Sequence, residues 1–168
     1  MSERHPNVIH QDEVAWGERG NGKRFGLRGK RLAHAAGARR LGCSLYELAP
    51  GKRSFPFHYH LANEEAIYIL EGEATARMGE REVVVRAGDY IAMPTGPAHA
   101  HQLLNHTETP VRYLCMSTLQ EPEVAVYPDS KKVGVLGGPG SIDASGKQLM
   151  QLTRQGESLT YWDGEDEP

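Results

Sequence analysis

Apolar and polar side chains alternate along several short segments in the middle of the chain. Residues 41–48 alternate in this way and end at Pro50-Gly51, a dipeptide typical of turns. Similar short segments follow at residues 54–60, 66–70, 74–78, 82–86, 90–93, 98–104, 111–119, 124–127 and 132–136. Short strands about every 8–12 residues, with no long helical period between them, predict an all-β antiparallel barrel or sandwich.

The regions that flank these strands have a different composition. Residues 1–40 are polar and rich in glycine, and we expect them to form an N-terminal arm packed on the barrel. Residues 41–127 form the predicted barrel core. Residues 128–168 continue the same domain with short strands, a loop over residues 134–146 and a C-terminal tail.

Composition and charge narrow the range of partners. A chain of 168 residues fits one domain, and its formal net charge of -3 gives no reason to expect nucleic acid or an anionic membrane. The segment from Arg19 to Arg40 carries eight Lys or Arg residues and no Asp or Glu. We interpret this segment as a solvated arm, with an anion site as the alternative.

The two cysteines and the hydropathy of the chain indicate in which cell compartment the protein is expected. Cys43 and Cys115 are far apart in sequence and form no C-x-x-C motif, so a thiol redox site or cysteine zinc site is not expected. Neither a secretory signal nor an apolar stretch of membrane-spanning length is recognised. We therefore expect a cytoplasmic protein with a small-molecule substrate. We also expect a homodimer formed through the barrel edges and the N-terminal arm, because an edge strand must be covered and the residues before Leu41 are long enough to reach a neighbour.

Two His-x-His pairs carry the candidate chemistry. Side chains at positions i and i+2 of a strand point to the same face, so His58 and His60 can offer two imidazole nitrogens to one ion. Glu64 and Glu65 follow, and a divalent metal accepts mixed imidazole and carboxylate ligands. A second pair, His99 and His101, lies about forty residues later. Either both pairs converge inside the barrel, or one of them faces solvent.

The segments around these two histidine pairs resemble the two sequence motifs of the cupin superfamily. Residues 51–72 are similar to the first cupin motif, which contains a His-x-His pair, a Glu and a later Gly. The Glu-to-Gly spacing of that motif selects Glu65 with Gly72, and not Glu64. Residues 88–105 are similar to the second motif. The resemblance implies a double-stranded β-helix, the jelly-roll barrel of cupins, with one divalent metal ion on His58, His60, Glu65 and a later His.

The second motif leaves two candidates for that later histidine. Counting from Gly96 selects His99, whereas counting back from Asn105 selects His101. The bacterial subgroup that the chain resembles keeps three residues between the ligand His and the Asn, which favours His101. His99 then lies one step along the same face, within reach of a substrate.

The resemblance also implies a range of activities. Small cupins of this subgroup are often assigned provisionally as sugar-phosphate isomerases, which predicts isomerisation through a metal-stabilised enediolate, with Glu64 or His99 as the base. An Fe- or Ni-dependent dioxygenase is the alternative enzyme, and a non-catalytic sugar- or effector-binding module is the alternative outside enzymes. The ligand set suits Zn, Mn, Fe or Ni equally.

Overall fold

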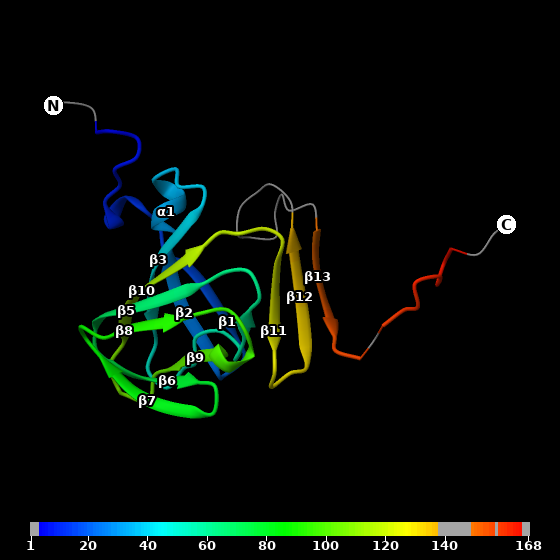
Figure 1. The fold of residues 1–168 in the computed structure, drawn as a ribbon. Helices are drawn as coiled ribbons and strands as arrows, with labels where there is room; N and C mark the ends of the chain where they lie inside the picture. Colours follow the sequence, from blue (N-terminus) through cyan, green and yellow to red (C-terminus); the bar gives the residue numbers. More distant parts are fainter. Residues whose placement is uncertain (1–3, 138–148, 157, 166–168) are drawn as a thin grey trace.

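The computed structural model describes residues 4–137, 149–156 and 158–165. The regular structure of these residues is almost all β-strand, with one short α-helix and two 3-10 turns (Figure 1). In chain order the elements are η1 Gln11–Glu13, β1 Gly17–Asn21, β2 Phe25–Lys30, α1 Leu32–Ala35, β3 Leu41–Leu48, β4 Tyr59–His60, β5 Glu65–Glu71, β6 Glu73–Met78, β7 Arg81–Arg86, β8 Tyr90–Met93, η2 Pro97–His99, β9 His101–Leu104, β10 Val111–Thr118, β11 Glu123–Tyr127, β12 Lys132–Gly137 and β13 Leu149–Arg154.

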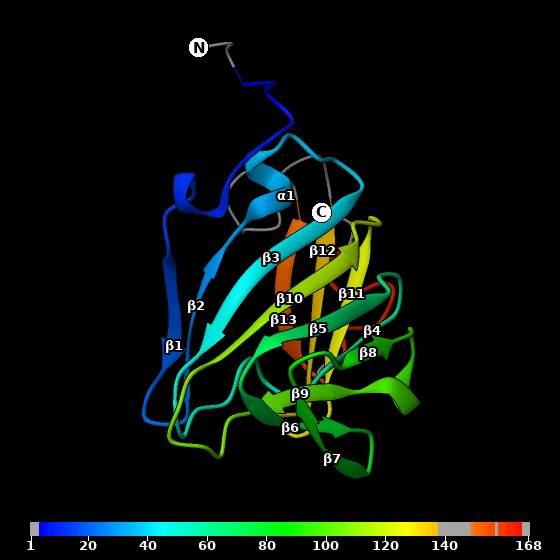
Figure 2. The same cartoon turned by 90° about the vertical axis from the view of Figure 1, so that its left-hand side faces the viewer.

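Three antiparallel sheets organise these strands. The largest has the order β1-β2-β3-β10-β5-β8, and a smaller sheet has the order β7-β6-β9 (Figure 2). Figure 1 shows β11, β12 and β13 standing beside the barrel, and β11 reaches it by pairing with the two residues of β4. The predicted all-β jelly-roll barrel is confirmed, because long-range antiparallel pairing of short strands is what the alternating pattern requires.

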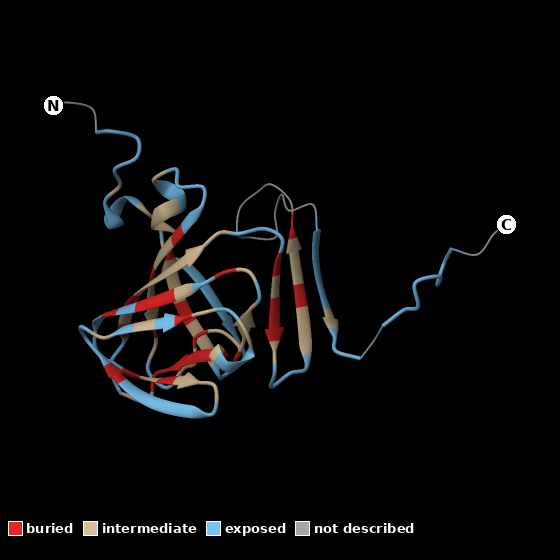
Figure 3. Ribbon diagram, viewed as in Figure 1, coloured by how far each residue is buried: buried red, intermediate tan, exposed pale blue. Residues whose placement is uncertain are grey.

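The apolar positions of the alternating segments fill the barrel interior. Leu48, Ile69 and Val111 have no exposed surface, and Tyr113 is 1% exposed. They belong to one cluster of buried side chains that draws on both barrel sheets (Figure 3). Burial alternates along β6 and at the start of β10, as period-2 alternation predicts, whereas all four residues of β9 are buried.

The N-terminal region is more regular than an arm alone. Residues 17–30 form β1 and β2, and β2 extends the large sheet by pairing with β3. Two cations of the basic segment have partners there. The Arg28 guanidinium pairs with Glu47 at 2.8 Å, and Lys30 donates to the Gln11 carbonyl while lying 4.7 Å from the Trp16 ring.

Two predicted strands are shorter in the structure. Only Tyr59 and His60 pair as a strand within the segment 54–60. The segment 98–104 begins in the 3-10 turn η2 and becomes strand only at β9. Gly96, with φ of 102°, and Pro97 at the first helical position explain this turn, because both residues favour a break in extended backbone.

Beyond the barrel, β11 and β12 lie where the pattern predicts them, whereas β13 was not predicted. Residues 134–137 of the expected loop belong to β12, and residues 138–146 lie outside the described residues. The side chains of Leu159, Tyr161 and Trp162 are 82%, 84% and 71% exposed in the single chain.

The homodimer, in which a partner could cover exposed side chains and strand edges, stays a prediction. No helix among the described residues is both long and apolar enough to cross a membrane.

Candidate metal centre

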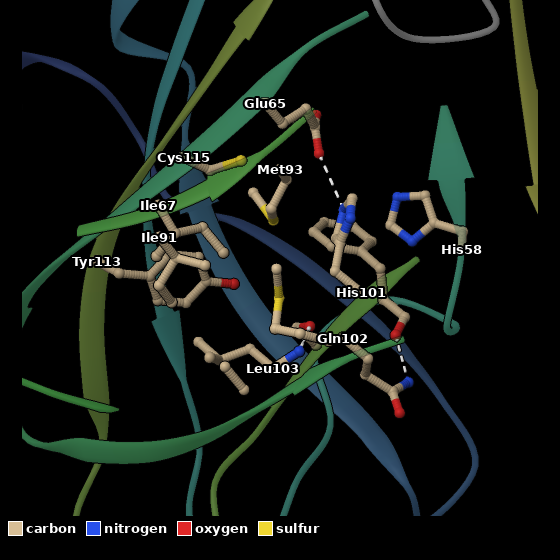
Figure 4. A pocket seen from close by; sticks show the side chains of 14 residues that line it. His58, Glu65, Ile67, Ile91, Met93, His101, Gln102, Leu103, Tyr113 and Cys115 are labelled. Atoms are coloured by element: carbon tan, nitrogen blue, oxygen red, sulfur yellow. Dashed lines mark hydrogen bonds and ion pairs between the residues drawn. The ribbon is translucent and has the colours of Figure 1, made fainter. Parts of the chain in front are cut away.

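Four of the predicted site residues meet at one end of the barrel. His60 ends β4, Glu65 begins β5 and His101 begins β9, while His58 directly precedes β4. The backbones of His58 and His101 hydrogen-bond reciprocally at 3.2 and 2.8 Å, and their ring centroids lie 4.6 Å apart with the planes tilted by 57°. One donor atom from each of His58, His60, Glu65 and His101 lies within 4.8 Å of the other three. Figure 4 shows the side chains of His58, Glu65 and His101.

Hydrogen bonds at Nδ1 orient the imidazole rings. The Nδ1 atom of His58 lies 2.7 Å from the Pro56 carbonyl oxygen, and that of His101 lies 3.0 Å from the His99 carbonyl oxygen. Because a carbonyl only accepts, both Nδ1 atoms carry the proton. The lone pairs of these rings are therefore at Nε2, the arrangement found in histidines that ligate metals through Nε2.

The remaining nitrogens lack hydrogen-bond partners. His101 Nε2 and His60 Nε2 lie 3.3 and 3.4 Å from Glu65 Oε2, but neither contact has hydrogen-bond geometry, and both nitrogens are buried. Buried polar atoms without a partner are costly and call for an ion or another group. Three imidazoles and one carboxylate with orphaned nitrogens fit a divalent transition metal.

A fifth residue, Glu123, was missed by the sequence analysis. Its carboxylate is buried and accepts hydrogen bonds from the backbone amides of Leu61, Ala62 and Asn63 at 3.2, 3.4 and 2.8 Å. The Oε2 atom also lies 3.5 Å from Nδ1 of His60. Glu123 opens an ordinary apolar strand 63 residues after His60, so no local sequence signal marks it.

Electrostatics separate the ionisable groups of the cluster. Although burial favours a neutral carboxyl, the close imidazoles of His101 and His60 favour the ionised form and hold the pKa of Glu65 well below its usual range. Burial opposes charging of His60, but Glu123 and Glu65 outweigh it and raise its pKa to about 9. Burial, with the neighbouring His101 and His60, lowers the pKa of His58 to about 4. In the metal-free protein, these carboxylates therefore favour a protonated His60 at neutral pH.

A small cavity lies inside the barrel next to the cluster. The space that centres of water-sized molecules can occupy is about 30 Å³, enough for one or two waters. Figure 4 shows Tyr113 and Met93 facing His101 across this space. Burial raises the pKa of the Cys115 thiol well above its usual value, so this thiol is not a nucleophile. The cavity wall is mostly apolar, with these lining residues: Ser54, Phe55, His58, Glu65, Ile67, Ala76, Met78, Ile91, Met93, His101, Gln102, Leu103, Tyr113 and Cys115.

The structure does not bring the two candidate bases into the cluster. Glu64 is exposed, and its backbone amide donates to the Thr118 hydroxyl at 3.0 Å while the neighbouring Glu65 turns inward. His99 is half-buried in η2, and its carbonyl oxygen is what orients His101. The choice of His101 over His99 agrees with the cluster geometry, since His101 supplies the donor atom there.

Comparisons with known proteins agree with this architecture. Residues 44–117 match the family model described as Cupin domain. No curated protein matches the chain. Among solved structures, a sugar phosphate isomerase of the cupin superfamily from Silicibacter pomeroyi is 25% identical, with a TM-score of 0.76, over 92% of this chain and 97% of that chain.

Two further structures share the fold. A proposed sugar phosphate isomerase from Acidithiobacillus ferrooxidans is 23% identical with a TM-score of 0.75, over 92% of this chain and 96% of that chain. A protein from Thermotoga maritima predicted to be an oxalate decarboxylase is 22% identical with a TM-score of 0.59, over 67% and 99%. The barrel, its two motifs and the family-model match lead to one conclusion: residues 44–117 of this chain form a cupin domain.

Proposed function

We propose that His58, His60, Glu65 and His101 hold one divalent metal ion and that the protein is an enzyme acting on a small oxygen-bearing molecule. One observation carries this proposal. Three imidazoles and one carboxylate place donor atoms within 4.8 Å of one another, while two of the Nε2 atoms have no hydrogen-bond partner. Structural ion pairs rarely leave buried nitrogens in this state.

The surrounding residues prepare the centre for this role. A bound divalent ion would supply Lewis-acid polarisation of a substrate carbonyl or hydroxyl oxygen. The ionised Glu65 lowers the net charge of the site. Backbone carbonyls hold the proton of His58 and His101 at Nδ1 and leave the Nε2 lone pairs free for an ion, while the Glu123 carboxylate lies 3.5 Å from Nδ1 of His60 and favours a proton there.

Isomerisation of a sugar or sugar phosphate is the first reaction to test. Support comes from the names of the two relatives that span nearly the whole chain. The side chains of His60 and Glu65 are 14% and 17% exposed, so a substrate can approach the centre from outside the barrel. The reaction also needs a base that moves a proton between two carbons. Glu64 and His99 stay the candidates for that base, and each would have to reach the substrate from the rim.

The inner cavity favours a second candidate, a reaction that consumes dioxygen. Among the described residues, its lining contains no Lys or Arg and no carboxylate besides Glu65, and only about 30 Å³ is open to the centres of water-sized molecules. A small apolar space beside His58 and His101 suits an apolar diatomic molecule better than a polyol. In this alternative, the organic substrate approaches from outside and dioxygen occupies the cavity.

Metal analysis followed by activity assays tests the proposal. The protein is purified without a chelator or a histidine tag, and its metals are quantified alongside the variant His58→Ala/His60→Ala. We expect close to one equivalent of metal in the parent protein and none in the variant. Interconversion of aldose and ketose phosphates supports isomerisation, and dioxygen uptake with iron in the site supports the second candidate. Stoichiometric metal in the double variant would refute the site itself.

A further inference from the structure

One face of the four-stranded sheet continues outward from the metal centre. His60 pairs with Ala125, and alternate residues of a strand share a face, so Glu123 and Tyr127 lie on the same face as His60. Tyr127 is directly opposite Lys132, which places Lys132 on this face as well. The predicted ligand His60 therefore lies at the β4 edge of this sheet, and the face that it shares continues across β11 to β12 and β13.

Ring contacts link the centre to this outer part of the face. The Tyr127 ring stacks on His58, with centroids 5.8 Å apart and planes at 20°. The Lys132 ammonium lies 5.1 Å from the centroid of the same Tyr127 ring. Gly134, next on the same face, lies close beside this ring, since a side chain there would contact Tyr127 and Leu152 at about 3.6 Å. An aromatic surface thus leads from a predicted ligand to an ammonium group.

A second cation lies beside Lys132. Arg154 is its direct partner in the antiparallel β12–β13 pair, and both side chains point to the same face. Like charges directly opposite each other destabilise a sheet. Within the described ranges, neither side chain forms an ion pair, and the nearby Asp129 is held by Arg77 at 2.6 and 3.0 Å. The pair consequently has unmatched positive charge next to an aromatic surface.

We propose that Lys132 and Arg154 form a phosphate subsite, which binds the phosphate group of a substrate whose other end reaches the metal centre. This inference rests on the proposed function, because the centre defines where the reacting end lies. Two cations with several donors each match a dianion with three acceptor oxygens. The Tyr127 ring between them and His58 would contact the carbon chain of the substrate.

Calorimetric titration with inorganic phosphate tests the subsite at low ionic strength, in both metal-free and metal-loaded protein. The test variant is Lys132→Gln/Arg154→Gln, which removes two charges but keeps polar side chains. The control is Arg81→Gln/Arg86→Gln, which removes two exposed charges from β7 and so matches the change in net charge. We expect phosphate to bind about tenfold or more weakly to the test variant and equally to the control and the parent.

The outcomes separate this inference from the metal site. Metal content is measured on the same samples, and all variants should retain it. Loss of phosphate affinity in the test variant alone, with or without metal, supports the subsite even if the metal proposal fails. Equal weakening in both double variants would show a general charge effect and overturn the subsite. Undiminished binding in the test variant, or no binding to the parent, would overturn it as well.

Discussion

Replacing Glu123 with Gln tests how the protein supports its metal ligands. The substitution keeps the size of the side chain but removes the charge that lies 3.5 Å from Nδ1 of His60. Loss of a carboxylate behind a ligating histidine typically weakens metal binding about 10- to 100-fold. That range corresponds to about 1.4–2.7 kcal/mol of binding free energy. We expect the variant Glu123→Gln to lie within it.

The structure also predicts a separate cost for folding. Oε1 of Glu123 accepts from Leu61 and Ala62, and Oε2 accepts from Asn63, so a Gln amide group must face at least one backbone amide. An unsatisfied buried donor costs about 1–3 kcal/mol of unfolding free energy. Denaturant titration of the metal-free protein measures this term independently of the metal.

Competition with a chromophoric chelator measures the metal dissociation constant for the parent, for Glu123→Gln and for a control. The control is Glu108→Gln, which removes an exposed carboxylate outside the cluster. If the folded variant Glu123→Gln binds metal within about twofold of the parent, Glu123 does not support His60 and the reasoning is wrong.

Three further measurements follow from the same structure. His101→Ala should lose the metal while His99→Ala retains it, as measured by elemental analysis; the reverse pattern would make His99 the ligand. In the metal-free protein, the pKa of His58 is about 4, below the unfolded value of 6.5, so the unfolding free energy falls as the pH drops from 6.5 to 4. The pKa of His60 is about 9, above the unfolded value, so the unfolding free energy falls as the pH rises from 6.5 to 9. The contribution of these two groups to the unfolding free energy should therefore peak near pH 6.5, and denaturant titrations that rise steadily from pH 4 to 9 would contradict this. Ile69→Ala, at a position with no exposed surface, should lower the unfolding free energy by about 2–5 kcal/mol, and a loss below 1 kcal/mol would mean that the core repacks.

The alternation of apolar and polar residues predicted the positions of most barrel strands and the faces on which their side chains lie. The alternation over 41–48 and 111–119 gives β3 and β10, because each strand buries one face in the same core. The His58-x-His60 pair shares a face for the same geometric reason. The family motif, and not the spacing alone, distinguished Glu65 from the exposed Glu64.

What could not be predicted depends on pairing between distant segments. Glu123 reaches His60 only because β11 pairs with β4, and nothing near either residue encodes that partnership. The strands β1 and β2 lie in a polar, glycine-rich segment whose pairing with β3 overrides its weak intrinsic preference. Residues 54–58 form no continuous strand, because only Ser54 and His58 reach the neighbouring segment, through backbone hydrogen bonds to Leu103 and His101.

The same distant pairing determines how the site is assembled during folding. His58 forms a β-bridge with His101, and β4 pairs with β11. Each of these contacts closes a long loop of the chain, and the chain entropy of that loop is lost before the contact forms. Barrels dominated by such pairings fold in milliseconds to seconds, and their last contacts are absent from the transition state. An ion that needs all four side chains therefore cannot act as a folding nucleus. We expect a bound ion to slow unfolding of this protein while leaving its folding rate almost unchanged.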